Sequence, residues 1–190
     1  MIIYRDNIDP DKEILDILSD DEFNKRFYHE ESNIITTFHN HDNYKDLNKL
    51  SNDFYSVIVE KMMKKFSLYE ISRYSWKGWY QSYFSFTEGH SPHTHMGFHE
   101  LFSFVHFLSV PEKPCFYFLI DDKKQYINEK NGDFVIFPSW AIHGVDSIST
   151  GERKVFSGNV SYSFIKLTET MFLNTELISD NHCILRINEV

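Results

Sequence analysis

The sequence contains little cysteine and no long apolar run. Its 190 residues include two cysteines, Cys115 and Cys183, and neither belongs to a Cys-x-x-Cys pair. A zinc ribbon or a redox-active dithiol is therefore not indicated. No apolar stretch is long enough to span a bilayer, and the first residues lack the basic start and the apolar run of a secretion signal. We expect a cytoplasmic protein without a membrane partner.

Positive charge is also scarce. The chain has 19 Lys and Arg residues against 28 Asp and Glu residues, so its formal net charge is −9 with histidine neutral. Nonspecific binding to a phosphate backbone normally needs the opposite balance. Nucleic acid is thus disfavoured as a partner, and a small molecule or a protein side chain is the expected substrate.

Apolar and aromatic residues are plentiful, at 42% and 17% of the chain, which suffices for the core of one domain. Apolar spacing predicts helices over 11–27 and 44–66. From about residue 70, short aromatic and β-branched runs separated by turn residues predict antiparallel strands. The predicted strands are 79–86, 101–110, 115–120, 133–137 and 154–167.

These patterns predict a fold that is mainly β with flanking α, built as a barrel or a two-sheet sandwich. We expect a single domain over 1–190. It would comprise a mainly helical N-terminal flank (1–68), a strand-rich core (70–165) and a C-terminal extension (166–190), with 183–187 as a candidate last strand.

Histidine is unusually frequent, and five of the ten histidines lie between His90 and His106. In an extended strand, residues two apart project from the same face, so His93 and His95 would present two imidazoles to one metal ion. Neutral imidazole is a good ligand for iron, zinc, copper or nickel. The same spacing at His39 and His41 falls in a polar stretch that we interpret as a surface loop.

A third ligand and an anion anchor are suggested further along the chain. His143 follows an apolar strand that starts after Gly132 and ends at Pro138, so it would lie at the rim of the barrel. Arg153 begins the next strand, and a guanidinium inside a barrel needs a carboxylate partner. A bound dicarboxylic acid would supply one through a bidentate contact; the alternative is a surface arginine beside Glu152.

The motifs taken together resemble the iron(II)- and 2-oxoglutarate-dependent oxygenases, in particular the small members common in bacteriophage genomes. The resemblance covers about residues 75–164 and rests on His93-Thr94-His95 and on the segments 104–111, 132–143 and 152–159. It implies a double-stranded β-helix, or jelly roll, with Fe(II) as metal and 2-oxoglutarate as co-substrate. His93, His95 and His143 would be the metal-binding catalytic residues, and Arg153 and Ser157 the co-substrate-binding residues.

The activity that the resemblance implies is hydroxylation of an unidentified substrate, with release of succinate and CO2. One residue departs from the family pattern, because His95 stands where a carboxylate is usual. His95 is then either a metal ligand or a bystander. The second case resembles the aspartyl β-hydroxylases, which use two histidines and no carboxylate. The register His95-Met96-Gly97 also resembles the His-x-Gly motif of iron halogenases.

Two other functions stay open. Glu100, placed after the histidine pair, resembles part of the first cupin motif, which would make the protein a cupin-type metal enzyme that does not use 2-oxoglutarate. A noncatalytic jelly-roll binding protein is the third alternative. The other histidines and two tryptophans have less specific interpretations. His90 and His99 would lie in loops, and His106 would lie in or under the barrel. Trp79 would pack in the core or at the rim, whereas Trp140 would lie beside the metal.

Overall fold

The computed structural model describes residue 2 and residues 4–38, 44–65, 73–84, 87–97, 100–162 and 185–189. Its helices are α1 (Lys12–Leu18), α2 (Asp21–Phe27), the short 3-10 helix η1 (Glu30–Ser32) and α3 (Lys45–Lys65). Its strands are β1 (Tyr4–Asn7), β2 (Tyr28–His29), β3 (Ile34–Thr36), β4 (Arg73–Phe84), β5 (His90–His93), β6 (Glu100–Ser109), β7 (Phe116–Ile120), β8 (Lys123–Tyr126), β9 (Asp133–Pro138), β10 (His143–Val145), β11 (Glu152–Tyr162) and β12 (Leu185–Glu189).

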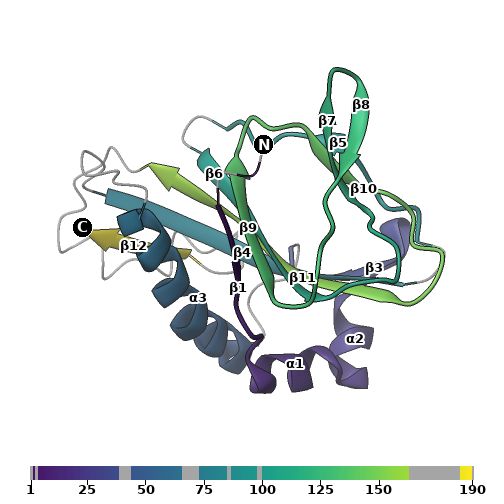
Figure 1. Cartoon of the computed structure of the whole chain (residues 1–190). Helices are drawn as coiled ribbons and strands as arrows, with labels where there is room; N and C mark the ends of the chain where they lie inside the picture. Colours follow the sequence, from purple (N-terminus) through teal and green to yellow (C-terminus); the bar gives the residue numbers. More distant parts are fainter. Residues whose placement is uncertain are drawn as a thin grey trace.

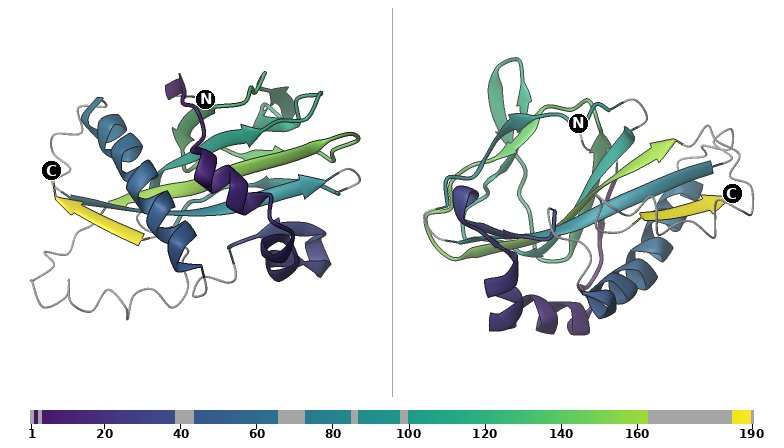
Figure 2. Two further views of the ribbon diagram at one scale, coloured as in Figure 1. Left: turned by 90° about the horizontal axis from the view of Figure 1, so that it is seen from below. Right: turned by 180° about the vertical axis from the view of Figure 1, so that it is seen from behind.

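The strands form two antiparallel sheets that face each other (Figure 1). The larger sheet has the order β1-β9-β6-β11-β4-β3-β2, and β12 also pairs with β4. The smaller sheet has the order β5-β10-β7-β8. Helices α1, α2 and α3 lie against the outer face of the larger sheet, as the views from below and behind also show (Figure 2). The predicted mainly β fold with flanking helices is confirmed.

Alternation along the central strands divides the apolar residues between two cores. Phe104, Phe134 and Phe156 point toward the helices and belong to the cluster that contains Leu18, Phe23 and Val59. Their sequence neighbours on the opposite face belong to the cluster between the two sheets, and these are Val105, Val135 and Val155. The larger sheet is therefore covered on both faces.

The N-terminal flank differs from its prediction in two ways. The helix expected over 11–27 is two helices, because the Asp20 side chain accepts hydrogen bonds from the backbone N–H groups of Glu22 and Phe23 and so caps a new helix. The flank also contributes β1, β2 and β3 to the larger sheet, strands too short to show a periodic pattern. The division of the chain into flank, core and extension stays a prediction.

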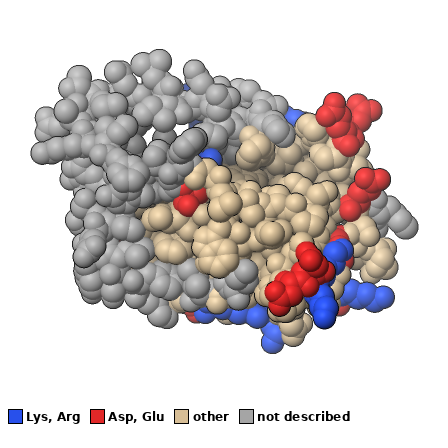
Figure 3. Space-filling model, turned by 90° about the horizontal axis from the view of Figure 1, so that it is seen from above, with Lys and Arg blue, Asp and Glu red and all other residues tan. Residues whose placement is uncertain are grey.

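Charge is distributed unevenly on the face shown in Figure 3. Among the residues that the structure describes, acidic and basic side chains gather toward the edge of this face, and its middle is mostly uncharged. No helix in the described part of the chain is long and apolar enough to cross a membrane.

Candidate metal centre

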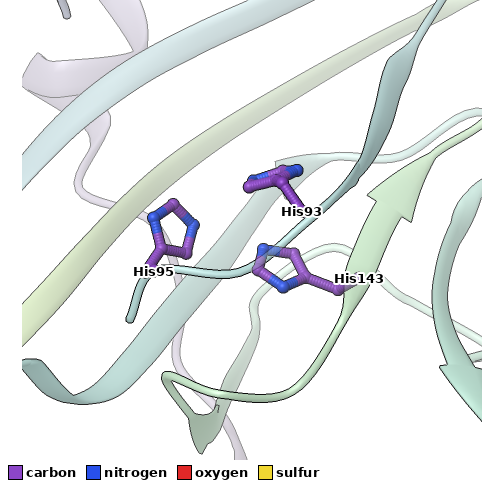
Figure 4. Close-up of side chains that lie close together, drawn as sticks. All are labelled: His93, His95 and His143. Atoms are coloured by element: carbon purple, nitrogen blue, oxygen red, sulfur yellow. The ribbon is translucent and has the colours of Figure 1, made fainter. Parts of the chain in front are cut away.

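Three histidines meet at the junction of two neighbouring strands of the smaller sheet. His93 ends β5 and His143 begins β10, and the two residues are directly opposite in the antiparallel register. His95 follows β5, where its backbone N–H donates to the carbonyl of Ser139 at 2.9 Å. The candidate ligand atoms of the three side chains all lie within 4.8 Å of one another, and the rings point toward a common centre (Figure 4).

Hydrogen bonds orient two of these imidazoles. Nδ1 of His143 lies 2.9 Å from the carbonyl oxygen of Ala141, and Nδ1 of His93 lies 2.8 Å from that of Ser91. A carbonyl oxygen only accepts, so each Nδ1 carries the proton and donates it, which leaves the lone pair of Nε2 available. Metal-binding histidines commonly use such a bond on the second nitrogen to fix the tautomer and the ring orientation.

Burial keeps two of these imidazoles, those of His95 and His143, in the form that binds a metal. Burial is the main cause that lowers the pKa of His143 to about 3, and the nearby His93 and His95 lower it further. Burial and the neighbouring His93 likewise lower the pKa of His95 to about 4. Both side chains are neutral at neutral pH, and only a neutral imidazole can coordinate. This arrangement can therefore hold one transition-metal ion.

The histidines line a cavity of about 440 Å³ between the two sheets. Alternate residues of adjacent strands form its wall, namely Ile34 and Thr36 of β3, Trp79, Gln81 and Tyr83 of β4, and Arg153 and Ser157 of β11. Among the described residues that line the cavity, Arg153 is the only one with a formal charge at neutral pH when histidine is counted as neutral.

Arg153 is buried in this wall with 1% of its surface exposed. Its guanidinium carbon lies 5.2 Å from the ring centre of Tyr83 and 5.3 Å from that of Phe107. Its Nε atom has no hydrogen-bond partner, and no ion pair to it is found among the described residues. Glu152 pairs with Lys154 instead, at 3.2 Å. The alternative of a surface arginine beside Glu152 is therefore wrong.

Strand register separates the two ends of the cavity. Arg153 lies opposite Tyr83, whereas Ser157 lies opposite Trp79. The Trp79 ring is centred 6.1 Å from that of His95. Four residues of an extended strand span roughly 13 Å, so the Arg153 backbone and the histidine end are well apart. Ser157 lies at the Trp79 end, and its role in co-substrate binding stays a prediction.

Several other candidates lie away from the three histidines. The Glu100 carboxylate pairs with Lys77 at 3.6 Å and is not part of the three-histidine group. His106 faces the helices, where Tyr55 and the carbonyl of Ile8 bind its ring nitrogens. Trp140 is 55% exposed and does not line the cavity. His39, His41 and His99 lie outside the described residues.

Sequence reasoning missed part of the cavity wall. Tyr83 and Gln81 follow Trp79 at the spacing of one strand face, so alternation along β4 could have indicated them. Ile34, Thr36 and Phe38 also line the cavity, but β3 has only three residues and offers no periodic signal.

Comparison with known proteins supports the fold. No family model matches the sequence, and no curated protein matches it significantly. Among solved structures, a viral collagen prolyl hydroxylase from Paramecium Bursaria Chlorella virus-1, described as a 2OG complex, is 14% identical with a TM-score of 0.59, over 84% of this chain and 96% of that one. A Pseudomonas putida prolyl-4-hydroxylase is 12% identical with a TM-score of 0.60, over 84% of this chain and 92% of that one.

A third similar structure is an oxidoreductase of the 2OG-Fe(II) oxygenase family from Burkholderia pseudomallei. It matches at 13% identity with a TM-score of 0.41, over 45% of this chain and 42% of that one, and adds nothing to the assignment. The two longer matches lead to the conclusion that this chain has the double-stranded β-helix fold of the prolyl hydroxylases.

Proposed function

We propose that the protein is a non-haem iron(II)- and 2-oxoglutarate-dependent dioxygenase that hydroxylates its substrate and releases succinate and CO2. The observation that carries this proposal is the buried Arg153, which has no carboxylate partner among the described residues and lines the same cavity as His93, His95 and His143. A buried guanidinium without an anion is costly. A dicarboxylic acid bound in the cavity would remove this cost.

The histidine set fits iron(II). Imidazole nitrogens suit iron, and three of them on one side leave coordination positions open for small molecules. Because the three ligands are neutral, a bound divalent ion and Arg153 would leave the cavity strongly positive. A dianion such as 2-oxoglutarate compensates this charge better than a neutral molecule. Together, bound iron(II) and 2-oxoglutarate would supply the activation of dioxygen.

Each residue has a defined task in this proposal. His93, His95 and His143 would hold the metal, and burial keeps the imidazoles of His95 and His143 unprotonated at neutral pH. Arg153 binds the far carboxylate of the co-substrate with its planar fork of N–H donors. Tyr83 packs against that guanidinium and keeps water from it.

The protein would act on a side chain of another protein. Two of the solved structures with this fold are named prolyl hydroxylases, which supports a substrate of this class. A small-molecule substrate is the alternative.

A cupin-type enzyme that does not use 2-oxoglutarate is the second candidate. The observation in its favour is His95, an imidazole where the oxygenases usually have a carboxylate. Its weakness is Glu100, which would be the additional cupin ligand but is paired with Lys77. A cupin-type enzyme would not bind 2-oxoglutarate, so the buried guanidinium of Arg153 would have no dicarboxylate to balance its charge.

The deciding experiment is a titration of the anaerobic, metal-free protein with iron(II) and then with 2-oxoglutarate. We expect the weak visible charge-transfer band of an iron–2-oxoglutarate chelate, and slow succinate formation once air is admitted without substrate. Iron binding without this band and without succinate would favour the cupin. Absence of iron binding would contradict both enzymes.

A further inference from the structure

We infer that His90 is a further co-substrate-binding residue, whose imidazole donates a hydrogen bond to 2-oxoglutarate beside the metal-binding histidines. This inference rests on the proposed function and adds a positioning residue to that same site. The expectation that His90 lies in a loop is wrong, because the residue begins β5 and lines the cavity.

A β-bulge turns the His90 side chain into the cavity. In the pairing of β5 with β10, His93 is opposite His143. His90 is opposite Val145, so a step of three residues on β5 faces a step of two on β10. Residues three apart in a regular strand project from opposite faces, whereas the extra residue of a bulge returns them to one face. Pro92 lies within this step, where its missing N–H group is tolerated.

The His90 ring lies beside the candidate metal ligands but outside their set. Its centre is 4.4 Å from that of the His93 ring. The close group of ligand atoms found among the described residues comprises those of His93, His95 and His143, without His90. A metal ligand must approach its ion to about 2.1 Å. A ring next to the group suits contact with a molecule bound at the metal better than coordination of the metal.

The ring is on the side of the cavity that leads to Arg153. His90 is exposed overall, yet partial desolvation is the main cause that lowers its pKa to about 4, followed by the charges of His93 and Arg153. The guanidinium is therefore within electrostatic reach of this ring. Lys77, and not Arg153, is the non-histidine cation that contributes to lowering the pKa of His95. A dicarboxylate that extends from Arg153 to the metal ligands would thus pass His90.

The ring nitrogens of His90 are available to a ligand. Nδ1 of His93 and Nδ1 of His143 each donate to a backbone carbonyl, whereas no hydrogen bond to the His90 ring is found in the part of the chain that the structure describes. An imidazole carries at least one N–H group in either protonation state, and its hydrogen bond to a carboxylate is charge-assisted. His90 would therefore add a directional donor to the fixed charge of Arg153.

The test measures co-substrate binding and metal binding separately. Isothermal titration of the iron(II)-loaded protein with 2-oxoglutarate under anaerobic conditions gives the first, and competition for iron(II) with a coloured chelator gives the second. We expect His90→Ala and His90→Phe to raise the dissociation constant of 2-oxoglutarate about tenfold, because a hydrogen bond to a charged group is lost. Their affinity for iron(II) should equal that of the wild-type protein.

Two amide variants separate the hydrogen bond from packing. His90→Asn and His90→Gln carry N–H donors at about the positions of Nδ1 and Nε2, so one of them should recover part of the affinity for 2-oxoglutarate. His90→Phe keeps a ring of similar shape but has no donor. Glu88→Gln is the matched control, because Glu88 is exposed, lies two positions before His90 and does not line the cavity. It should bind 2-oxoglutarate as the wild-type protein does.

Three results would overturn the inference. One is an unchanged affinity for 2-oxoglutarate in His90→Ala and His90→Phe. Another is a parallel loss of affinity for iron(II), which would make His90 a metal ligand. The third is equal weakening in all four variants, which would assign the effect to packing. The proposed function fails differently, because the wild-type protein itself would then not bind 2-oxoglutarate, and the inference would fall with it.

Discussion

At the residue scale, the cavity combines a group of histidine side chains with one cation, Arg153, among the described residues that line it. Burial lowers the pKa values of His95 and His143 and so removes their positive charge, whereas a guanidinium stays protonated in any protein environment. Arg153 is therefore the fixed positive charge to which an anionic ligand can bind. This difference leads to two separate predictions, one for the anion and one for the metal.

Arg153→Ala should raise the dissociation constant of 2-oxoglutarate by about 100-fold, because a bidentate charge-assisted contact contributes about 3 kcal/mol. Isothermal titration of the iron(II)-loaded protein under anaerobic conditions measures this change. Arg153→Lys is the control, since it keeps the charge but loses the planar fork, and should recover only part of the affinity. Equal affinity in all three proteins would remove Arg153 from the co-substrate site.

His143→Ala should reduce the affinity for iron(II) by at least about 100-fold, because losing a ligand is more severe than losing one of the outer partners that orient it. His95→Ala distinguishes a ligand from a bystander, and we expect a loss of similar size. Competition for iron(II) with a coloured chelator measures the affinity of both variants. His29→Ala, a histidine outside the cavity, should bind iron normally. Unchanged iron binding in His143→Ala would discredit the ligand set.

At the element scale, the position of the cavity depends on how closely β4, β11 and β6 approach one another. Gly158 of β11 lies directly opposite Gly78 of β4 and Phe104 of β6. A Cβ atom at Gly158 would overlap the backbone carbonyl of Lys77 and the ring of Phe104. Glycine at this point lets the strands pair in the register that brings Arg153 beside Tyr83 and Ser157 beside Trp79.

Gly158→Ala should therefore lower the free energy of unfolding by about 2–3 kcal/mol, because the backbone of β4 cannot move aside without breaking the pairing. Urea denaturation followed by circular dichroism measures the loss. Val57→Ala, on the exposed face of α3, provides the comparison and should change stability by less than about 0.5 kcal/mol. A similarly small change in Gly158→Ala would show that the strands have room to separate.

At the scale of the whole molecule, a buried histidine connects the helical layer to the larger sheet. His106 of β6 is fully buried; the Tyr55 hydroxyl of α3 donates to its Nδ1, and its Nε2–H donates to the carbonyl of Ile8, both at 2.9 Å. Desolvation lowers the pKa of His106 to about 4. This histidine is therefore neutral in the folded protein wherever an exposed histidine would be protonated.

The stability that His106 contributes should be fully present above pH 6.5 and be lost as the pH falls from 6.5 to about 4. In that window the unfolded chain takes up a proton at this residue and the folded protein does not. The expected loss is up to about 3 kcal/mol. Urea unfolding of the metal-free protein at several pH values measures it, and His106→Gln should show a shallower dependence on pH. Parallel curves for the two proteins would contradict this assignment.

The sequence by itself determined the features that depend on near neighbours. Alternating apolar runs predicted β6, β7 and β9 to within one residue at each end, because side-chain direction within one strand follows from local geometry. The strand expected over 154–167 overlaps β11, and its last five residues lie outside the described residues. The His-x-His spacing indicated that His93 and His95 share a site, although His95 lies after the end of β5. The prolyl hydroxylase-like fold agrees with the family that these motifs resemble.

Only the tertiary structure decided which distant residues meet. The pairing of β5 with β10 brings His143 opposite His93. The register of β11 on β4 buries Arg153 over Tyr83 without an acidic partner among the described residues. The same register places Trp79, rather than the exposed Trp140, beside His95. The physical reason is that strand order and register arise from packing between segments far apart along the chain, and the pattern within each segment does not encode its partner.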